Sequence, residues 1–367
     1  MKLIPLSALF LLALFPSLRT WAQTSAAAQA EPDFAAMIQP VPQNAKFSDP
    51  DYYIWCGTLV KGDDSKYHLF YSRWPRHLGF SAWVTHSEIA HAVGDTPIGP
   101  FKHRDVALPP RGKEFWDGLC THNPTVHRFG DRYYLYYMGN TGDGVPTKGQ
   151  LNWTHRNNQR IGVAVAKSPD GPWTRMDRPV VDVSQAPDAP DSLMTSNPAV
   201  CARPDGGFLI VYKAVGRQRA LPFGGPVVHL TATADSPTGP FTKQLRPTFT
   251  APGAAFPAED PFIWFDPTTR RYRAIVKDQN GYFTSQRGRS LILWESTDGF
   301  DWKLATNPMV TTTEIRWADG SKQPVHYLER PQLFFEDNRP AVLLAAVGEV
   351  AGMPSSYNIQ IPLHPRL

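Results

Sequence analysis

A pattern that returns five times along this chain of 367 residues constrains its fold more than any other feature. Each copy is an apolar run, a turn of acidic or glycine residues, and a second run rich in aromatic or aliphatic residues. Four copies open with a polar pair followed by Pro124, Pro198, Pro261 or Pro331, and the first copy has Thr58 at the proline position. Spacings of 66, 74, 63 and 70 residues separate the copies. Repeats of this length indicate one supersecondary unit used many times.

A second turn signal falls between the copies and doubles the number of strands in each. Segments 96–101, 168–173, 236–241 and 296–302 each follow a β-rich run and combine glycine with proline or an aromatic residue. Each repeat therefore contains four strands, and four-stranded units around an axis are the blades of a propeller. The sequence predicts an all-β, five-bladed β-propeller with four-stranded antiparallel blades. The fifth copy lacks this turn, so its outer edge is either short or completed by the N-terminal segment.

The N-terminus has the layout of a secretory signal: a basic start, a short apolar core and small residues near Ala22. We expect residues 1–22 to be a signal peptide, 23–44 an N-terminal segment and 45–367 one propeller domain. The protein is then periplasmic or secreted. The apolar run of this signal is too short for a membrane-spanning helix, and prolines interrupt it.

The net charge and the cysteine content bear on the binding partners and on how the fold is stabilised. Removal of the signal leaves a net charge of about +2, which gives no reason to expect nucleic acid or a membrane as a partner. Three cysteines are an odd number and do not form a disulfide framework, although a Cys56–Cys120 bridge stays open. We expect a monomer whose partner is an oligosaccharide substrate, for the reasons that follow.

The first strands of the blades line the axial channel, so the residues that open them meet at one mouth. Because the second strands return antiparallel, the residues that end those strands lie at the same mouth. The polar type varies at these positions while the apolar pattern around them persists, and this variety indicates a site built from every blade. The opening positions are Cys56-Gly57, His122-Asn123, Ser196-Asn197, Glu259-Asp260 and Glu329-Arg330, with Trp55 just before the first pair, and the return positions are Arg73, Gly139-Asn140, Lys213 and Lys277.

Several carboxylates around a polar mouth match the needs of glycoside hydrolysis, in which one carboxylic acid protonates the leaving oxygen and a carboxylate activates water or attacks carbon. The candidate catalytic residues are Asp49, Asp51, Glu259 and Glu329. For either glutamate the alternative is a strand cap or an ion pair with an arginine. For the aspartates the alternative is the ordinary turn chemistry of Asp-Pro-Asp.

Five blades, openings of the form Asp-Pro or Glu-x-Pro, and aromatic hairpins resemble the five-bladed glycoside hydrolases of family 43 and its relatives, families 32, 62, 68, 117 and 130. The resemblance covers about residues 45 to 365. It implies an aspartate base at an Asp-Pro opening in the first blade, where Asp49-Pro50 fits and Asp51 is adjacent. It also implies a glutamate acid two residues before a proline, where Glu259 fits best and Glu329 second.

The chain departs from the family pattern in two blades. The resemblance implies an acid in the third blade, but Ser196 stands there, and the second blade has Asn123, with Asp117 nearby, in place of an opening aspartate. His122 is therefore an alternative acid.

We expect an exo-acting glycosidase that releases one sugar from a plant or algal oligosaccharide. The expected substrate-binding residues are Trp55, Arg73, Asp117, His122, Asn123, Asn197, Lys213, Asp260, Lys277 and Arg330. Three cations among them, Arg73, Lys213 and Lys277, suggest an acidic or sulfated sugar, unless each pairs with a carboxylate. The alternatives are a non-catalytic carbohydrate-binding propeller and a polysaccharide lyase.

No cofactor is expected, although propeller relatives make a structural calcium ion in the channel plausible. His86 and His91 flank a glutamate as in zinc helices, but a strand places these two histidines on opposite faces. The glutamate also stands at the wrong position for that motif. We therefore expect no metal at this segment.

Overall fold

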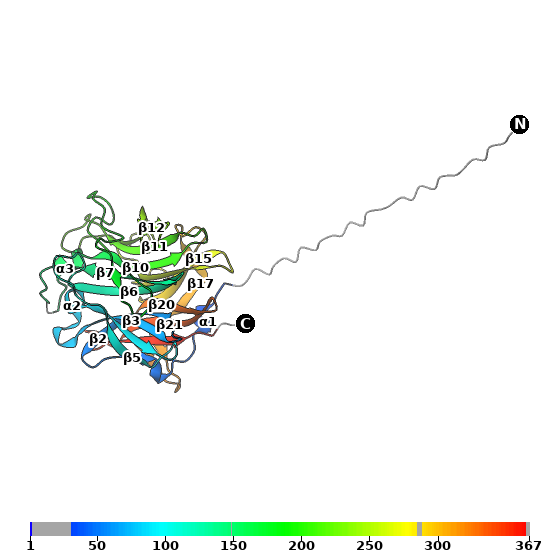
Figure 1. The fold of residues 1–367 in the computed structure, drawn as a ribbon, viewed down its shortest axis with the longest axis horizontal. Helices are drawn as coiled ribbons and strands as arrows, with labels where there is room; N and C mark the ends of the chain where they lie inside the picture. Colours follow the sequence, from blue (N-terminus) through cyan, green and yellow to red (C-terminus); the bar gives the residue numbers. More distant parts are fainter. Residues whose placement is uncertain (2–30, 148, 285–287, 365–367) are drawn as a thin grey trace. The chain divides into compact units, whose positions relative to one another are not determined.

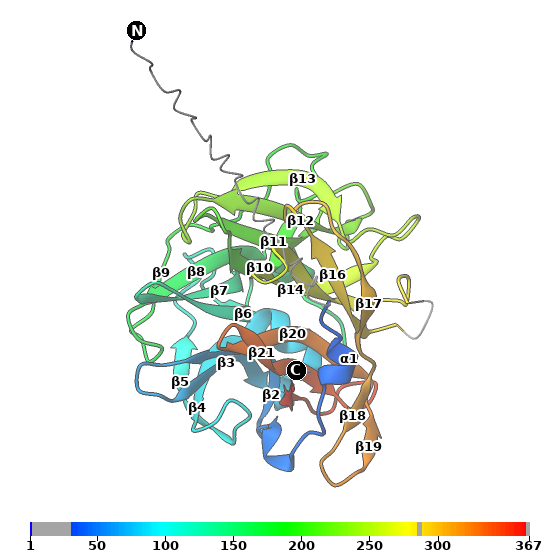
Figure 2. The ribbon, with the colours of Figure 1, turned by 90° about the vertical axis from the view of Figure 1, so that its right-hand side faces the viewer.

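Five four-stranded antiparallel sheets stand in a ring, as the computed structural model shows (Figures 1 and 2). It describes residues 1, 31–147, 149–284 and 288–364. The predicted five-bladed propeller is therefore confirmed, whereas the expected signal peptide lies outside the described residues. None of the described helices is long and apolar enough to cross a membrane.

Each blade runs from an inner strand at the channel to an outer strand. Blade 1 contains β2 (Tyr52–Lys61), β3 (Tyr67–Pro75), β4 (Glu88–Gly94) and β5 (Phe101–Leu108). Blade 2 contains β6 (Cys120–Phe129), β7 (Arg132–Asn140), β8 (Arg160–Ala166) and β9 (Thr174–Arg175). Blade 3 contains β10 (Met194–Ala202), β11 (Phe208–Val215), β12 (Val227–Ala234) and β13 (Thr242–Thr248). Blade 4 contains β14 (Ala258–Asp266), β15 (Arg271–Asp278), β16 (Ser290–Ser296) and β17 (Lys303–Thr311).

Blade 5 is closed by the beginning of the propeller domain. It contains β20 (Tyr327–Glu336), β21 (Arg339–Gly348), β22 (Tyr357–Pro362) and, as its outer strand, β1 (Lys46–Phe47). Antiparallel pairing of β1 with β22 places Lys46 opposite Ile359. The open question about the outer edge is thus answered: residues 46 and 47, directly after the expected N-terminal segment 23–44, complete it.

Short elements fill the connections between strands. The helices are α1 (Phe34–Met37), α2 (Trp83–His86) and α3 (Trp153–Asn157), with 3-10 turns η1 (Gln43–Ala45), η2 (Arg76–Leu78) and η3 (Phe80–Ala82). A hairpin of β18 (Glu314–Arg316) and β19 (Lys322–Pro324) precedes β20. Helices α2 and α3 lie in β3–β4 and β7–β8 connections, which emerge on the mouth side of the ring.

Glycine makes the outer turns possible. Gly99, Gly171 and Gly239 have φ of 90°, 82° and 84°, a region that side chains with a Cβ rarely adopt. In the second blade, the Gly171 amide donates to the carbonyl of Ser168 at 2.9 Å and closes the turn. The repeated Ser-Pro-x-Gly-Pro signal therefore marks the bend into the fourth strand.

Every inner strand carries the same irregularity, which lies just before the proline in blades 2 to 5 and just before Gly57 in blade 1, so that Gly57 and not Thr58 stands at the proline position. The pairing register shifts there in all five blades. The residue at the shift has a left-handed φ between 48° and 57°, which is rare outside glycine and costs backbone energy. These five left-handed residues are Cys56, Asn123, Asn197, Asp260 and Arg330.

Candidate active site at the channel mouth

The five left-handed residues, which we call the axial ring, are joined by side-chain hydrogen bonds from blade to blade. The Cys56 thiol donates to Asn123 Oδ1 at 2.9 Å, Asn123 Nδ2 to Asn197 Oδ1 at 2.6 Å, and Asn197 Nδ2 to Asp260 Oδ1 at 2.7 Å. Arg330 Nη1 donates to the same Asp260 oxygen at 3.1 Å. All five side chains are buried, and burial raises the pKa of the Cys56 thiol to about 12, so it stays a neutral donor.

One residue before the ring, toward the mouth, two glutamates of adjacent blades share a lysine. Lys277 Nζ donates to Glu259 Oε2 at 2.6 Å and to Glu329 Oε1 at 2.9 Å. Lys213 Nζ donates to the other oxygen of Glu259 at 2.5 Å. The side chains of the two glutamates keep 16% and 13% exposure, whereas Lys277 keeps 2%. The carboxylates therefore remain within reach of a ligand, and the shared ammonium lies beneath them.

This arrangement drives the pKa values of the two glutamates apart. Burial by itself would raise the pKa of Glu259, but its ion pairs with Lys213 and Lys277 outweigh burial and hold that pKa well below the usual range. Burial raises the pKa of Glu329, which has only Lys277 as a cationic partner and is repelled by Asp260 and Glu259. Glu259 is thus ionised, and Glu329 is the carboxyl that holds a proton more readily.

In blade 1 the return strand places Ser72 at the mouth, one position before Arg73, which the sequence suggested. Lys213 pairs with Ser196 and Lys277 with Glu259, and the matching partner of Trp55 is Ser72. Arg73 points to the other face of its sheet, because neighbouring residues of a strand alternate.

Arg73 is paired within its own blade. Its guanidinium donates to Glu88 on β4 at 2.9 Å and contacts His103 on β5 at 3.2 Å, and it lies 4.4 Å from the Tyr52 ring. The structure therefore does not bring Arg73 to the glutamates.

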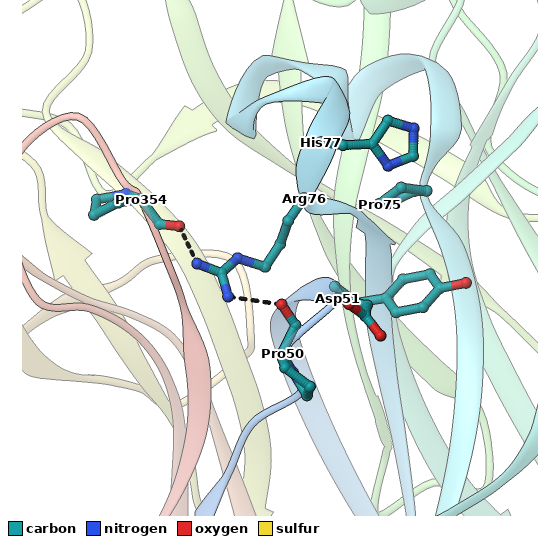
Figure 3. Close-up of a pocket in the computed structure, with 7 residues that line it drawn as sticks. Pro50, Asp51, Pro75, Arg76, His77 and Pro354 are labelled. Carbon is teal, nitrogen blue, oxygen red and sulfur yellow. Dashed lines mark hydrogen bonds between the residues drawn. The ribbon is translucent and has the colours of Figure 1, made fainter.

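Asp49 and Asp51 precede the first inner strand, which begins at Tyr52. Asp49 Oδ1 accepts the backbone N–H groups of Asp51 at 2.8 Å and Tyr52 at 3.2 Å, which is turn chemistry. Asp51 is five residues before Cys56, about 16 Å along an extended strand. It lines an open hollow between blades 1 and 5 (Figure 3), where Arg76 donates to the carbonyls of Pro50 and Pro354.

Asp117 has a full set of partners inside blade 2. Its carboxylate is fully buried, binds Arg111 at 2.6 Å and accepts from the Tyr137 hydroxyl at 2.6 Å. Arg175 approaches at 3.5 Å. Asp117 thus joins the β5–β6 connection to β7 and β9 of blade 2, and these partners occupy both oxygens of its carboxylate.

Trp55 and His122 occupy the same level as the two glutamates, in blades 1 and 2. The Trp55 ring packs edge-on against Phe80 at 5.5 Å. His122 Nδ1 lies 2.7 Å from Ser87 Oγ, and burial followed by the charges of Arg330 and Lys213 holds its pKa well below the ordinary value. A neutral imidazole at this place can accept or donate a hydrogen bond, but it carries no spare proton at neutral pH.

Two residues near the site were not found by sequence reasoning. Arg156 on α3 is buried beside Phe223. Burial lowers the pKa of its guanidinium, and the negative charge of Glu259 acts in the opposite direction. His229 on β12 is opposite Lys213, and burial lowers its pKa to about 3. Neither stands in a repeat opening, so the repeat pattern contains no signal for them.

The axial ring offers few oxygen ligands to a calcium ion. Calcium takes six to eight oxygens, yet Asp260 is the one carboxylate of the ring and is already paired with Arg330. A structural calcium ion stays a prediction. All three cysteines are free and buried, so the Cys56–Cys120 bridge is not formed.

Comparison with solved structures gives the same architecture. Zg3597, a family 117 glycoside hydrolase produced by the marine bacterium Zobellia galactanivorans, superposes with a TM-score of 0.58 at 18% identity, over 89% of each chain. A thermostable family-43 glycoside hydrolase gives 0.57 at 13% identity, over 88% of this chain and 93% of the other. A mutant of Cellvibrio cellulosa alpha-L-arabinanase gives 0.54 at 16% identity, over 86% and 92%.

No protein-family model matches the chain, and no curated protein matches its sequence. The structural likenesses therefore establish the fold, and the chemistry has to be argued from the residues at the mouth.

Proposed function

We propose that this protein is a glycoside hydrolase that acts on an oligosaccharide at the channel mouth. The observation that supports it is the pair Glu259 and Glu329, whose pKa values are driven in opposite directions around the shared Lys277. Such a pair supplies an acid and a carboxylate at one place. In the proposed reaction Glu329 protonates the glycosidic oxygen, and ionised Glu259 faces the anomeric carbon.

The spacing of the two carboxylates supports a retaining reaction. Because both bind one ammonium, at 2.6 and 2.9 Å, the two oxygens concerned are no more than about 5.5 Å apart. Retaining glycosidases hold their carboxyl groups roughly 5–5.5 Å apart, whereas inverting ones leave roughly 6.5–9.5 Å for a water molecule. Glu259 would then act as nucleophile, and Glu329 would later deprotonate the incoming water.

For the substrate we propose an oligosaccharide of plant or algal origin, cut from one end. The cations that suggested an acidic or sulfated sugar all have carboxylate partners: Lys213 and Lys277 bind the glutamates, and Arg73 binds Glu88. An anionic sugar would have to compete with these ion pairs. We therefore favour a neutral sugar at the glutamates over an acidic one.

A non-catalytic carbohydrate-binding propeller is the second candidate. It is supported by the turn role of Asp49 and by the ion pairs that occupy Glu259 on both oxygens. A lyase has less support, because it needs a base that removes a proton from the sugar. Burial and nearby cations hold the pKa of His122 well below its ordinary value, which makes its imidazole a weak base.

A product assay on neutral and acidic plant and algal oligosaccharides tests the proposal. We would compare wild type with Glu329→Gln and Glu259→Gln, and use Glu336→Gln as a matched control on the same strand as Glu329. Glu336 lies at the far end of β20, where it accepts a hydrogen bond from Tyr67. Each mouth variant should lose about 10²–10⁴-fold in kcat/KM, and the control should keep wild-type activity.

The same assay separates the alternatives. Full activity in either mouth variant would exclude that glutamate from the chemistry. Sugar binding without turnover by wild type would favour the binding propeller, and ultraviolet absorption from unsaturated uronates would identify a lyase. NMR of the first product formed would show retention or inversion at the anomeric carbon.

We also propose that the chain is exported through residues 1–22 and works as a monomer. N-terminal sequencing of the mature protein and light scattering would test these two proposals directly.

A further inference from the structure

Two buried histidines and an aspartate converge on the side of the ring opposite the mouth. His68 on β3, His91 on β4 and Asp170 in the β8–β9 turn present three ligand atoms within 4.8 Å of one another. His68 Nδ1 lies 2.9 Å from His91 Nε2 and 3.7 Å from Asp170 Oδ1. The histidine side chains are 0% and 1% exposed.

The outer nitrogen of each histidine faces a further carboxylate. His68 Nε2 lies 3.2 Å from Asp64 Oδ1, and His91 Nδ1 lies 3.2 Å from Asp105 Oδ1. An ionised carboxylate only accepts, so each outer nitrogen carries the N–H. Metal-binding histidines are held in this way, with one nitrogen donating to a carboxylate and the other free for the metal.

These contacts leave the centre of the cluster short of positive charge. With both outer nitrogens protonated, two neutral imidazoles turn lone pairs toward each other across 2.9 Å, which is unfavourable unless a cation lies between or beside them. Three carboxylates surround them, Asp64, Asp105 and Asp170. Among the residues that the structure describes, Arg104, 3.0 Å from Asp170, is the lysine or arginine that forms an ion pair with this set. The excess is two negative charges, which a divalent cation balances.

We propose that His68, His91 and Asp170 bind a zinc ion that ties blade 1 to the β8–β9 turn of blade 2. A point equidistant from the three ligand atoms lies no more than about 2.4 Å from each, against the 2.0–2.2 Å of zinc bonds to nitrogen and oxygen. The planes of the two rings are within 12° of parallel, so binding requires the rings to tilt toward Asp170. Histidine nitrogen and aspartate oxygen are both zinc ligands in proteins.

The surroundings favour a site with one open position. The Asp170 side chain is 35% exposed, so water can complete a tetrahedral set from that side. Phe70 lies parallel to the His91 ring at 4.8 Å and Trp173 packs edge-on against Phe70, which shields the histidines on the inner side. Gly62 leaves room for the pair, because a Cβ there would lie 2.7 Å from His68 Nε2.

Zinc titration of the full-length protein after chelator treatment tests the proposal, by calorimetry with zinc chloride and by the visible absorption of cobalt as a substitute. We expect one zinc ion per chain and a higher Tm with zinc. Asp170→Asn should weaken binding at least tenfold, and Asp105→Asn about 10–100-fold through the histidine it orients. Asp95→Asn, in the neighbouring β4–β5 turn and paired with Lys66, is the control that should bind as wild type does.

Three outcomes would overturn the zinc site: no stoichiometric binding by wild type, equal affinity in Asp170→Asn, or equal affinity in His91→Gln. If the histidines share a proton instead, Tm would change with pH and not with zinc. Because Asp170 lies in an exposed turn, its variant keeps the test valid even if His91→Gln does not fold. Activity at the mouth plays no part in these readouts.

Discussion

At the residue scale, the environment of each carboxylate decides what it can do. Glu259 and Glu329 occupy equivalent positions in adjacent blades, yet one binds two lysines and the other one. A single ion pair separates an ionised carboxylate from one with a raised pKa, and this difference could not be read from identical Glu-x-Pro motifs.

The pH dependence of kcat should reveal this difference. Glu329 works as the acid only while protonated, and its pKa is raised above the ordinary 4.5, mainly by burial. Activity should therefore be present at acid pH and fall as pH rises through the raised pKa, with about a tenfold loss for each further pH unit. Initial rates at saturating substrate from pH 4 to 9 measure this limb. A rate that stays flat across the range would contradict the role of Glu329.

Arg73→Met should affect stability and leave sugar recognition unchanged. The substitution leaves Glu88 and His103 without their guanidinium partner, so the free energy of unfolding should fall by about 1–3 kcal/mol. Urea unfolding measures this loss, and KM for the substrate found in the product assay should stay within about twofold of wild type. A large rise in KM with full stability would show that Arg73 reaches the mouth after all.

At the element scale, the axial ring turns a strand irregularity into a network. Each inner strand gains one residue at the bulge, and the left-handed residue there reaches the next blade through its side chain. Four of these residues stand before the repeat prolines, so the sequence predicted where they lie in the strands. The hydrogen bonds among these residues depend on the bulge, and the repeat pattern in the sequence does not predict a bulge.

Asn197→Asp should destabilise the ring in a pH-dependent way. Asn197 Nδ2 donates to Asp260 at 2.7 Å, and the substitution turns that donor into a second carboxylate. Two carboxylates at this distance share a proton, which raises the pKa of the pair in the folded state. Stability should be highest at acid pH and fall as pH rises through the raised pKa, with a loss of about 2–4 kcal/mol at pH 7.

Urea unfolding at pH 5 and pH 8 measures the effect, with Asn197→Ala as the control. The alanine variant loses the hydrogen bonds without adding charge, so its loss should be similar at both pH values. The same pH response in both variants would mean that the charge of Asp260 does not matter to the ring.

Register explains where sequence reasoning about the site failed. The inner openings of blades 2 to 5 and the outer turns were predicted correctly, because proline and glycine mark them. Blade 1 lacks the proline, and its opening pair is Trp55-Cys56, one residue before the predicted Cys56-Gly57. Arg73 was expected at the mouth, but Ser72 is the partner of Trp55, and a shift of one residue moves a side chain to the other face of a sheet. In blade 1 the inner strand begins three residues before Trp55, so Asp49 and Asp51 remain at the rim.

At the scale of the whole molecule, the ring is held closed by residues 31–47. Strand β1 has two residues, too few to show an alternating pattern, so the sequence left the closure open. Residues before it pack on blades 4 and 5: Phe34 is 1% exposed and lies edge-on to Trp264 at 6.0 Å. Glu31 lies 3.8 Å from buried Arg273. The closure thus combines pairing, apolar burial and a charge pair.

A chain that starts at Ser48 should be far less stable than one that starts at Glu31. The shorter chain loses β1, which leaves the edge of β22 unpaired, and it loses the buried side chains Phe34, Met37, Val41 and Phe47. Each such side chain contributes about 1.5–3 kcal/mol, so Tm should fall by roughly 10 °C or more.

Calorimetry of the two chains measures the difference, and Glu31→Gln in the longer chain isolates the charge pair. Arg273 also contacts Asp266 at 3.2 Å and Glu295 at 3.7 Å, so the single substitution should cost about 1 kcal/mol or less. Equal Tm for the two chains would mean that blade 5 is stable with three strands. If Glu31→Gln lowered Tm as much as the truncation does, the ion pair between Glu31 and Arg273 would be the main interaction that closes the ring. The expected order, with the truncation much larger, follows if apolar burial and strand pairing hold the ring closed.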